Sequence, residues 1–89
     1  MIKGQITIIN KLGLHARAAG KLVSEASAYS SQIKIGSNSR MVDAKSIMSV
    51  MLLAAGKGTQ LELEVDGLDE QEAYQAIEAL INNRFDEGE

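Results

Sequence analysis

The chain has 89 residues, no cysteine, one histidine and a formal net charge of −3 at pH 7. This length fits one domain over residues 1–89, and the composition excludes disulfides, thiolate metal sites and histidine-rich metal sites. We therefore expect neither a metal nor another cofactor. Most acidic residues lie from residue 62 onward, and an acidic balance is unsuited to nucleic acid, which needs a basic face.

The N-terminal residues lead directly into a strand pattern, and no secretory leader is recognisable. The longest apolar run, residues 47–55, is far shorter than the ~20 residues that cross a bilayer. We therefore expect a cytoplasmic chain without membrane insertion. Aromatic side chains make up only 3% of the sequence, which predicts an aliphatic core of Ile, Leu, Val, Met and Ala.

Residues 2–9 alternate between apolar and polar side chains, which is the pattern of a half-buried strand. Residues 10–14 form a connection, and we expect its two leucines, Leu12 and Leu14, to anchor it to the core. The apolar period then becomes helical, which predicts a helix over residues 16–29.

Two short strands over residues 32–36 and 40–43 flank a cluster of turn-forming residues, which predicts a hairpin. Ser46 precedes a short apolar run and is suited to the N-cap position of a helix. This favours a brief helix over about residues 47–53, although such a run could also form a buried strand. Residues 60–65 alternate clearly and predict another strand.

The sequence from Asp69 predicts a final helix in which Asp69 is the N-cap and Glu72 the reciprocal acid of a capping box. Its expected buried stripe consists of Ala73, Ala76, Ile77, Leu80 and Ile81. The polar tail over residues 86–89 is expected to be frayed.

The resulting order is β-α-β-β-α-β-α, with an antiparallel hairpin in the middle. It predicts an α+β fold in which helices cover one face of a single sheet and the other face meets water.

The single histidine, His15, lies where the first helix should begin, two residues before Arg17. Helix N-termini carry unpaired N–H groups and partial positive charge, so they bind anions. A guanidinium suits phosphate, and a neutral imidazole is nucleophilic. These features favour a phosphoryl acceptor over a surface histidine that happens to begin a helix. A general-base role is weaker because the motif offers no Ser, Cys or carboxylate for a hydrolytic site.

The short helix after Ser46 carries four large apolar side chains that one face cannot bury entirely. They are Ile47, Met48, Met51 and Leu52. Methionine suits adaptable binding surfaces, so this face is a candidate docking surface. Gly20, on the preceding helix, would allow a partner to approach closely. Ser46 is first of all an N-cap, and a phosphate placed on it would gain from the helix dipole.

Two motifs resemble those of the HPr family, the histidine-containing phosphocarriers of the bacterial phosphoenolpyruvate-dependent sugar phosphotransferase system. Residues 10–17 (Asn-Lys-Leu-Gly-Leu-His-Ala-Arg) resemble its active-site signature, and residues 45–51 (Lys-Ser-Ile-Met-Ser-Val-Met) its regulatory serine site. The resemblance covers nearly the whole chain. It implies an open-faced β-sandwich of four antiparallel strands with three helices on one side.

The resemblance also implies functional roles for individual residues. His15 would accept a phosphoryl group at Nδ1 from phosphorylated Enzyme I and pass it to a histidine of an EIIA domain, while Arg17 stabilises the phosphate. Ser46 would be phosphorylated by HPr kinase/phosphorylase, which impairs phosphorylation of His15. Partners would dock on the apolar surface together with Ala16 and Gly20. The chain would be a monomeric carrier and a substrate of partner transferases, not an enzyme.

The sequence departs from the family pattern after Arg17, where the family usually has proline and this chain has Ala18. Proline suits the first turn of a helix, so a looser helix start is expected here. Lysines that some members carry on the first helix are replaced by Ser24 and Ser27.

Three alternatives are weighed against a sugar-branch carrier. The acidic tail is similar to that of proteobacterial members, including the nitrogen-branch carrier NPr. An acylphosphatase-like or small-ligand-sensing module shares the element order, but Arg17 follows a histidine inside a helix instead of a glycine-rich loop. A purely regulatory paralogue would lack the histidine that is present here.

Overall fold

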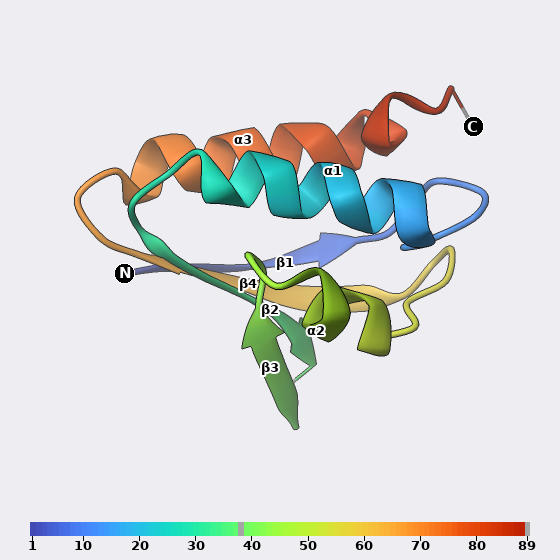
Figure 1. Cartoon of the computed structure of the whole chain (residues 1–89), viewed down its shortest axis with the longest axis horizontal. Coiled ribbons are helices and arrows are strands. Elements are labelled where there is room, and N and C mark those ends of the chain that lie inside the picture. Colours follow the sequence, from blue (N-terminus) through green and yellow to red (C-terminus); the bar gives the residue numbers. More distant parts are fainter. Residues whose placement is uncertain (38, 89) are drawn as a thin grey trace.

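The computed structural model describes residues 1–37 and 39–88, in which an antiparallel sheet underlies three helices (Figure 1). The strands are β1 (Ile2–Thr7), β2 (Gln32–Ser37), β3 (Arg40–Asp43) and β4 (Gln60–Asp66). Their order across the sheet is β1-β4-β2-β3, and every neighbouring pair is antiparallel. The predicted hairpin is confirmed as the β2–β3 pair.

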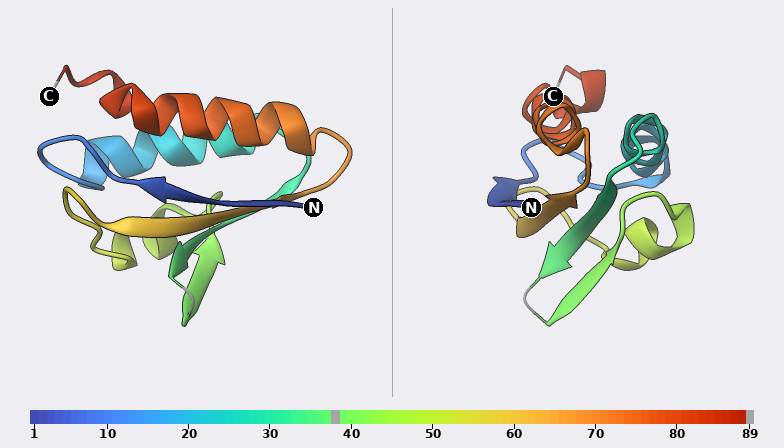
Figure 2. Two further views of the ribbon diagram at one scale, coloured as in Figure 1. Left: turned by 180° about the vertical axis from the view of Figure 1, so that it is seen from behind. Right: turned by 90° about the vertical axis from the view of Figure 1, so that its left-hand side faces the viewer.

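All three helices lie on the same face of the sheet, as the two views in Figure 2 show. They are α1 (Ala16–Ser27), α2 (Ile47–Leu52) and α3 (Glu70–Asn82), and a 3₁₀ turn, η1 (Arg84–Asp86), follows. The expected α+β open-faced sandwich is therefore confirmed. Within the described ranges, no helix combines the length and apolarity that a bilayer crossing demands.

Alternation along the strands produces this one-sided packing, because successive side chains point to opposite faces. In β2, Ile33 and Ile35 are fully buried whereas Lys34 between them is exposed. The regular strand β1 ends at Thr7, two residues before its predicted end. Ile8 nevertheless stays buried, because its amide donates to Thr59 (2.9 Å) and its carbonyl accepts from Gly58 (2.6 Å).

The core is aliphatic with one exception, Phe85, which is the largest fully buried side chain. The sequence prediction of a wholly aliphatic core was therefore wrong. The predicted methionines also stay outside, and Met48 is 71% exposed. Within the predicted stripe of α3, Ala73, Ile77 and Ile81 are buried, while Ala76 and Leu80 are half-buried.

The predicted capping box at α3 is not formed. Asp69 is the N-cap residue, but its side chain makes no capping hydrogen bond. Its carboxylate instead accepts from the amides of Ser30 and Ser31 (both 2.9 Å) and from the Ser31 hydroxyl. Asp69 thus ties the end of α1 to the start of α3, because three donors from another segment outcompete a local cap. These hydrogen bonds, from the Ser31 hydroxyl first, lower the pKa of Asp69 to about 2.

This depressed pKa predicts a specific pH dependence for the contribution of Asp69 to stability. A carboxylate whose pKa falls on folding stabilises the native state above its unfolded value of 3.8 and loses that effect as pH falls towards about 2. Asp69→Asn should lower the free energy of unfolding at pH 7. The gap, meaning the difference in this free energy between wild type and variant, should shrink as the pH falls from 5 to 2. Denaturant unfolding over this range measures the gap, with Glu72→Gln as the charge-matched control. A gap that stays constant with pH would contradict the assignment.

Candidate functional site

His15 is the N-cap residue of α1, as the sequence predicted. Its backbone is extended (φ −72°, ψ 176°) and its carbonyl accepts from the amide of Ala19 at 2.8 Å. The imidazole makes no capping hydrogen bond, and its side chain is 26% exposed. No acidic residue lies in the first turn of α1. The unpaired amides and positive dipole end therefore remain at the helix start beside the ring.

The loop before His15 is fastened to the loop between α2 and β4. The Leu14 amide donates to the Ala55 carbonyl at 2.8 Å. Gly13 has φ +69°, and a Cβ there would lie 2.6 Å from the same oxygen, so glycine is required for this approach. Leu14 is buried as predicted, but Leu12 is 67% exposed, so its predicted anchoring was wrong. One buried leucine and the backbone contacts suffice to hold the loop.

The segment after α3 reaches back to this loop, so the prediction of a frayed tail was wrong for residues 86 and 87. Residue 89 lies outside the described residues. The Glu87 carboxylate contacts Nε2 of His15 and accepts from Nδ2 of Asn10 at 2.9 Å. The hydrogen bond from Asn10, reinforced by His15 and the nearby Arg17, lowers the pKa of Glu87. The site therefore contains an ionised carboxylate that the sequence motif did not reveal.

Basic side chains gather beside this carboxylate. A hollow of about 250 Å³ is lined by Lys11, Leu12, Arg17, Lys21, Asp86 and Glu87. Arg17 itself is exposed on the first turn of α1, next to the unpaired amides. The combination suits a phosphate group, which gains from both the helix end and the guanidinium. Lys11 and Lys21 were not singled out by the sequence, because each only becomes a neighbour of Arg17 through the fold.

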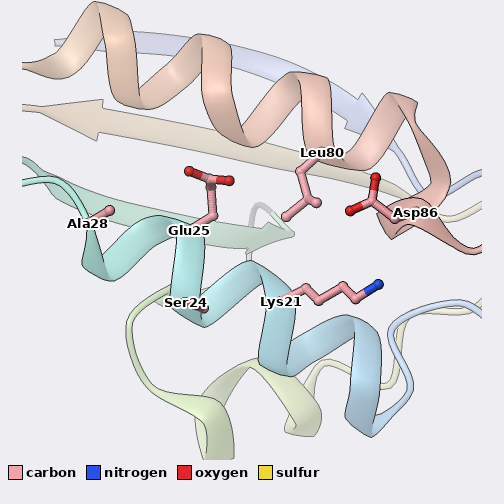
Figure 3. Close-up of a pocket in the computed structure, with 6 residues that line it drawn as sticks. All are labelled: Lys21, Ser24, Glu25, Ala28, Leu80 and Asp86. Atoms are coloured by element: carbon pink, nitrogen blue, oxygen red, sulfur yellow. The ribbon is translucent and has the colours of Figure 1, made fainter.

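A separate hollow of about 400 Å³ runs between α1 and α3 (Figure 3). Lys21, Ser24 and Glu25 line it from α1, Ala28 lines it just after that helix, and Leu80 and Asp86 line it from the opposite side. The Lys21 ammonium reaches across to the Phe85 carbonyl at 2.7 Å. Lys21 and Asp86 line both this hollow and the one beside Arg17, but neither His15 nor Arg17 lines this one.

Ser46 caps α2, as predicted, with its hydroxyl accepting from the Ser49 amide at 3.4 Å. Four apolar residues that follow Ser46 on α2 are exposed: Ile47 39%, Met48 71%, Met51 43% and Leu52 60%. We call these four residues the α2 patch. Their spacing places them on one side of the helix, while Val50 is buried beneath. Since α2 packs against α1, the patch and the histidine belong to neighbouring elements.

The remaining predicted residues lie on α1. Ala16 is its first residue and is exposed, whereas Ala18 is fully buried. A Cβ built on Gly20 meets open space, so no contact of the described chain requires glycine there. Ala18 therefore occupies the position of the expected family proline without interrupting the helix.

Comparison with known proteins shows the family of the chain. A family model described as the PTS HPr component phosphorylation site matches residues 2–83. The chain belongs to the HPr family. It is 61% identical over 89 residues to the phosphocarrier protein HPr of Cupriavidus necator, with both chains covered completely. It is 62% identical over 86 residues to that of Pseudomonas aeruginosa, with 96% of each chain covered.

A crystal structure of HPr from Thermoanaerobacter tengcongensis superimposes with a TM-score of 0.94 at 44% identity, covering 98% of both chains. These full-length matches favour an HPr carrier over a nitrogen-branch carrier or an acylphosphatase-like module. The chain is accordingly a phosphocarrier of the phosphotransferase system and not a catalyst.

Proposed function

We propose that His15 is the phosphoryl acceptor of this carrier and that Nδ1 is the atom phosphorylated. The observation that carries the proposal is its placement: the only histidine in the sequence sits at the start of α1 with its ring free from capping. The lone pair of Nδ1 attacks phosphorus, and the bond to the donor atom breaks with its electron pair returning to the donor. Arg17 and the amides of the first turn face the transferred negative charge.

The donor and acceptor are proposed to be phosphorylated Enzyme I and a histidine of an EIIA domain. Both belong to the phosphotransferase system in which HPr-family carriers work. Transfer requires an exposed, rigidly held nucleophile in line with phosphorus, while the partner supplies the remaining machinery. We place the carrier in the cytoplasm. We also propose that it is a monomer, since one chain supplies His15, Arg17 and Glu87.

The docking surface is proposed to be the α2 patch together with Ala16 and Gly20. Exposed apolar side chains lose contact with water when a partner covers them, and two methionines allow adjustment to more than one partner. The open space above Gly20 lets a partner backbone approach α1 closely.

Ser46 is proposed to be a regulatory site phosphorylated by HPr kinase/phosphorylase. Its hydroxyl is at the N-cap of α2, directly before the α2 patch. Phosphate there is stabilised by the helix N-terminus, so the helix need not unfold. The added charge would repel an acidic partner surface and hinder its desolvation.

The phosphoryl assignment is tested with phosphoenolpyruvate and Enzyme I. The wild-type chain should acquire about one acid-labile phosphate per molecule, while His15→Ala should acquire none because no other imidazole is present. Intact-mass measurement before and after acid treatment reports the modification. Uptake by His15→Ala equal to wild type, or none by wild type, would refute the proposal.

The docking assignment is tested with Met48→Ser. Because Met48 is 71% exposed, the substitution should change the free energy of unfolding by less than about 0.5 kcal/mol. It should weaken binding to Enzyme I by roughly tenfold, as expected for an apolar contact at an interface. Leu68→Ser is the matched control: Leu68 is fully exposed, in the β4–α3 connection at the other end of α1 (Figure 1). Equal losses for both variants in calorimetric titration would argue against a docking role.

The regulatory assignment is tested with Ser46→Asp, which places a permanent negative charge at the start of α2. The rate of His15 phosphorylation should fall by roughly tenfold, because like charges at an interface oppose association. Ser39→Asp introduces the same charge in the exposed turn between β2 and β3 and should leave the rate unchanged. Rates are followed by quenched-flow sampling. An unaltered rate in Ser46→Asp would count against this mechanism.

A further inference from the structure

We propose that Glu87 is a positioning residue: it holds the proton of His15 on Nε2, so that Nδ1 presents its lone pair to the phosphoryl donor. The proposal deepens the proposed function and rests on His15 being the acceptor. It concerns a residue 72 positions away from the histidine in the sequence.

Glu87 is placed by a turn that its surroundings hold firmly. Arg84, Phe85 and Asp86 have φ values of 56°, 52° and 62°, a conformation that residues other than glycine rarely adopt. The Phe85 ring is fully buried, and its carbonyl accepts from Lys21. These contacts turn the chain back over the start of α1, and Glu87 follows at once.

Asn10 then orients the carboxylate. Its side chain is fully buried, and its Nδ2 donates to both the Gly13 carbonyl (2.8 Å) and Oε1 of Glu87 (2.9 Å). Because both neighbours are acceptors, the amide must present its nitrogen to them. With Oε1 held by Asn10, the second oxygen, Oε2, faces Nε2 of His15. The Glu87 side chain is only 10% exposed, so this arrangement is largely shielded from water.

The contact determines which ring nitrogen can react. An ionised carboxylate has no hydrogen to donate, so Nε2 must carry the hydrogen that the contact requires. In the neutral ring Nδ1 is then the unprotonated nitrogen. A carboxylate that orients a histidine in this way fixes its tautomer and ring direction. Glu87 thus makes Nδ1 the nucleophile without touching the phosphoryl group.

The contact between Glu87 and His15 also suits the charges that develop on the ring during phosphoryl transfer. When Nδ1 bonds to phosphorus, the ring becomes cationic while the proton on Nε2 stays in place. The electron pair of the broken bond leaves with the donor, so no proton has to move at His15. The Glu87 carboxylate faces the cationic ring, and the positive charge of Arg17, which lines the same hollow as Glu87, is available to the transferred phosphate.

The first test observes the tautomer directly in the unphosphorylated, ¹⁵N-labelled full chain. Because the chain has one histidine, its ring nitrogens are assigned without ambiguity from long-range proton–nitrogen spectra at pH 8. In wild type, Nδ1 should show the shift of an unprotonated nitrogen and Nε2 that of a protonated one. Protonated Nδ1, or an even mixture, would overturn the proposal whether or not His15 accepts phosphate.

The second test compares Glu87→Ala and Glu87→Gln with Glu72→Ala, which removes an exposed acid at the distant start of α3. Glu87→Ala should shift the ring signals towards a mixture of tautomers and lower kcat/KM for phosphorylation roughly tenfold. Glu87→Gln keeps an acceptor oxygen, so its ring should keep the proton on Nε2 as in wild type. Its phosphorylation rate should lie between those of Glu87→Ala and wild type. Glu72→Ala should resemble wild type. Denaturant unfolding of each variant separates loss of fold from loss of positioning.

Two outcomes would overturn the proposal. Faster phosphorylation of Glu87→Ala would mean that the carboxylate obstructs the phosphate. Unchanged ring signals and rate in a folded Glu87→Ala would mean that the contact has no role. Failure of the acceptor assignment is recognised separately, because His15→Ala would then still take up phosphate.

Discussion

The fully buried amide of Asn10 is the contact on which the site depends. It joins the loop before α1 to the segment after α3, through hydrogen bonds to Gly13 and Glu87. Buried N–H donors are costly unless they are hydrogen-bonded, so Nδ2 of Asn10 favours the geometry in which both acceptors are present. The loop, the start of α1 and Glu87 consequently form one unit around His15. The sheet and the other helices supply the rigid base that keeps this unit in place.

The sequence alone predicted the features that repeat locally. The alternation of apolar and polar side chains in residues 2–9 and 60–65 indicated strands with one solvent-exposed face. The helical spacing after Ala16 indicated a helix that begins beside His15. The exposure of the α2 patch followed from geometry, since one side of a six-residue helix offers too little buried surface for four large side chains. The roles of Arg17 and Ser46 came from their positions in recognisable motifs, and they stay predictions until tested.

The features that the sequence did not reveal depend on contacts between distant segments. Phe85 stands in a polar stretch without periodicity, so nothing local indicates that it enters the core. Asp69 looked like a helix cap because its neighbours fit that pattern, yet the donors that bind it come from Ser30 and Ser31. Glu87 looked like part of a solvated acidic tail, and only the left-handed turn before it directs the carboxylate towards His15.

The long sequence separation within the site has a consequence for biosynthesis. Asn10 and Glu87 are 77 residues apart, and closing so long a loop costs chain entropy that only the completed fold offsets. Synthesis produces the histidine 72 residues before the carboxylate. A chain still on the ribosome therefore exposes His15 without its carboxylate partner. The contact between His15 and Glu87 therefore forms only after α3 has docked.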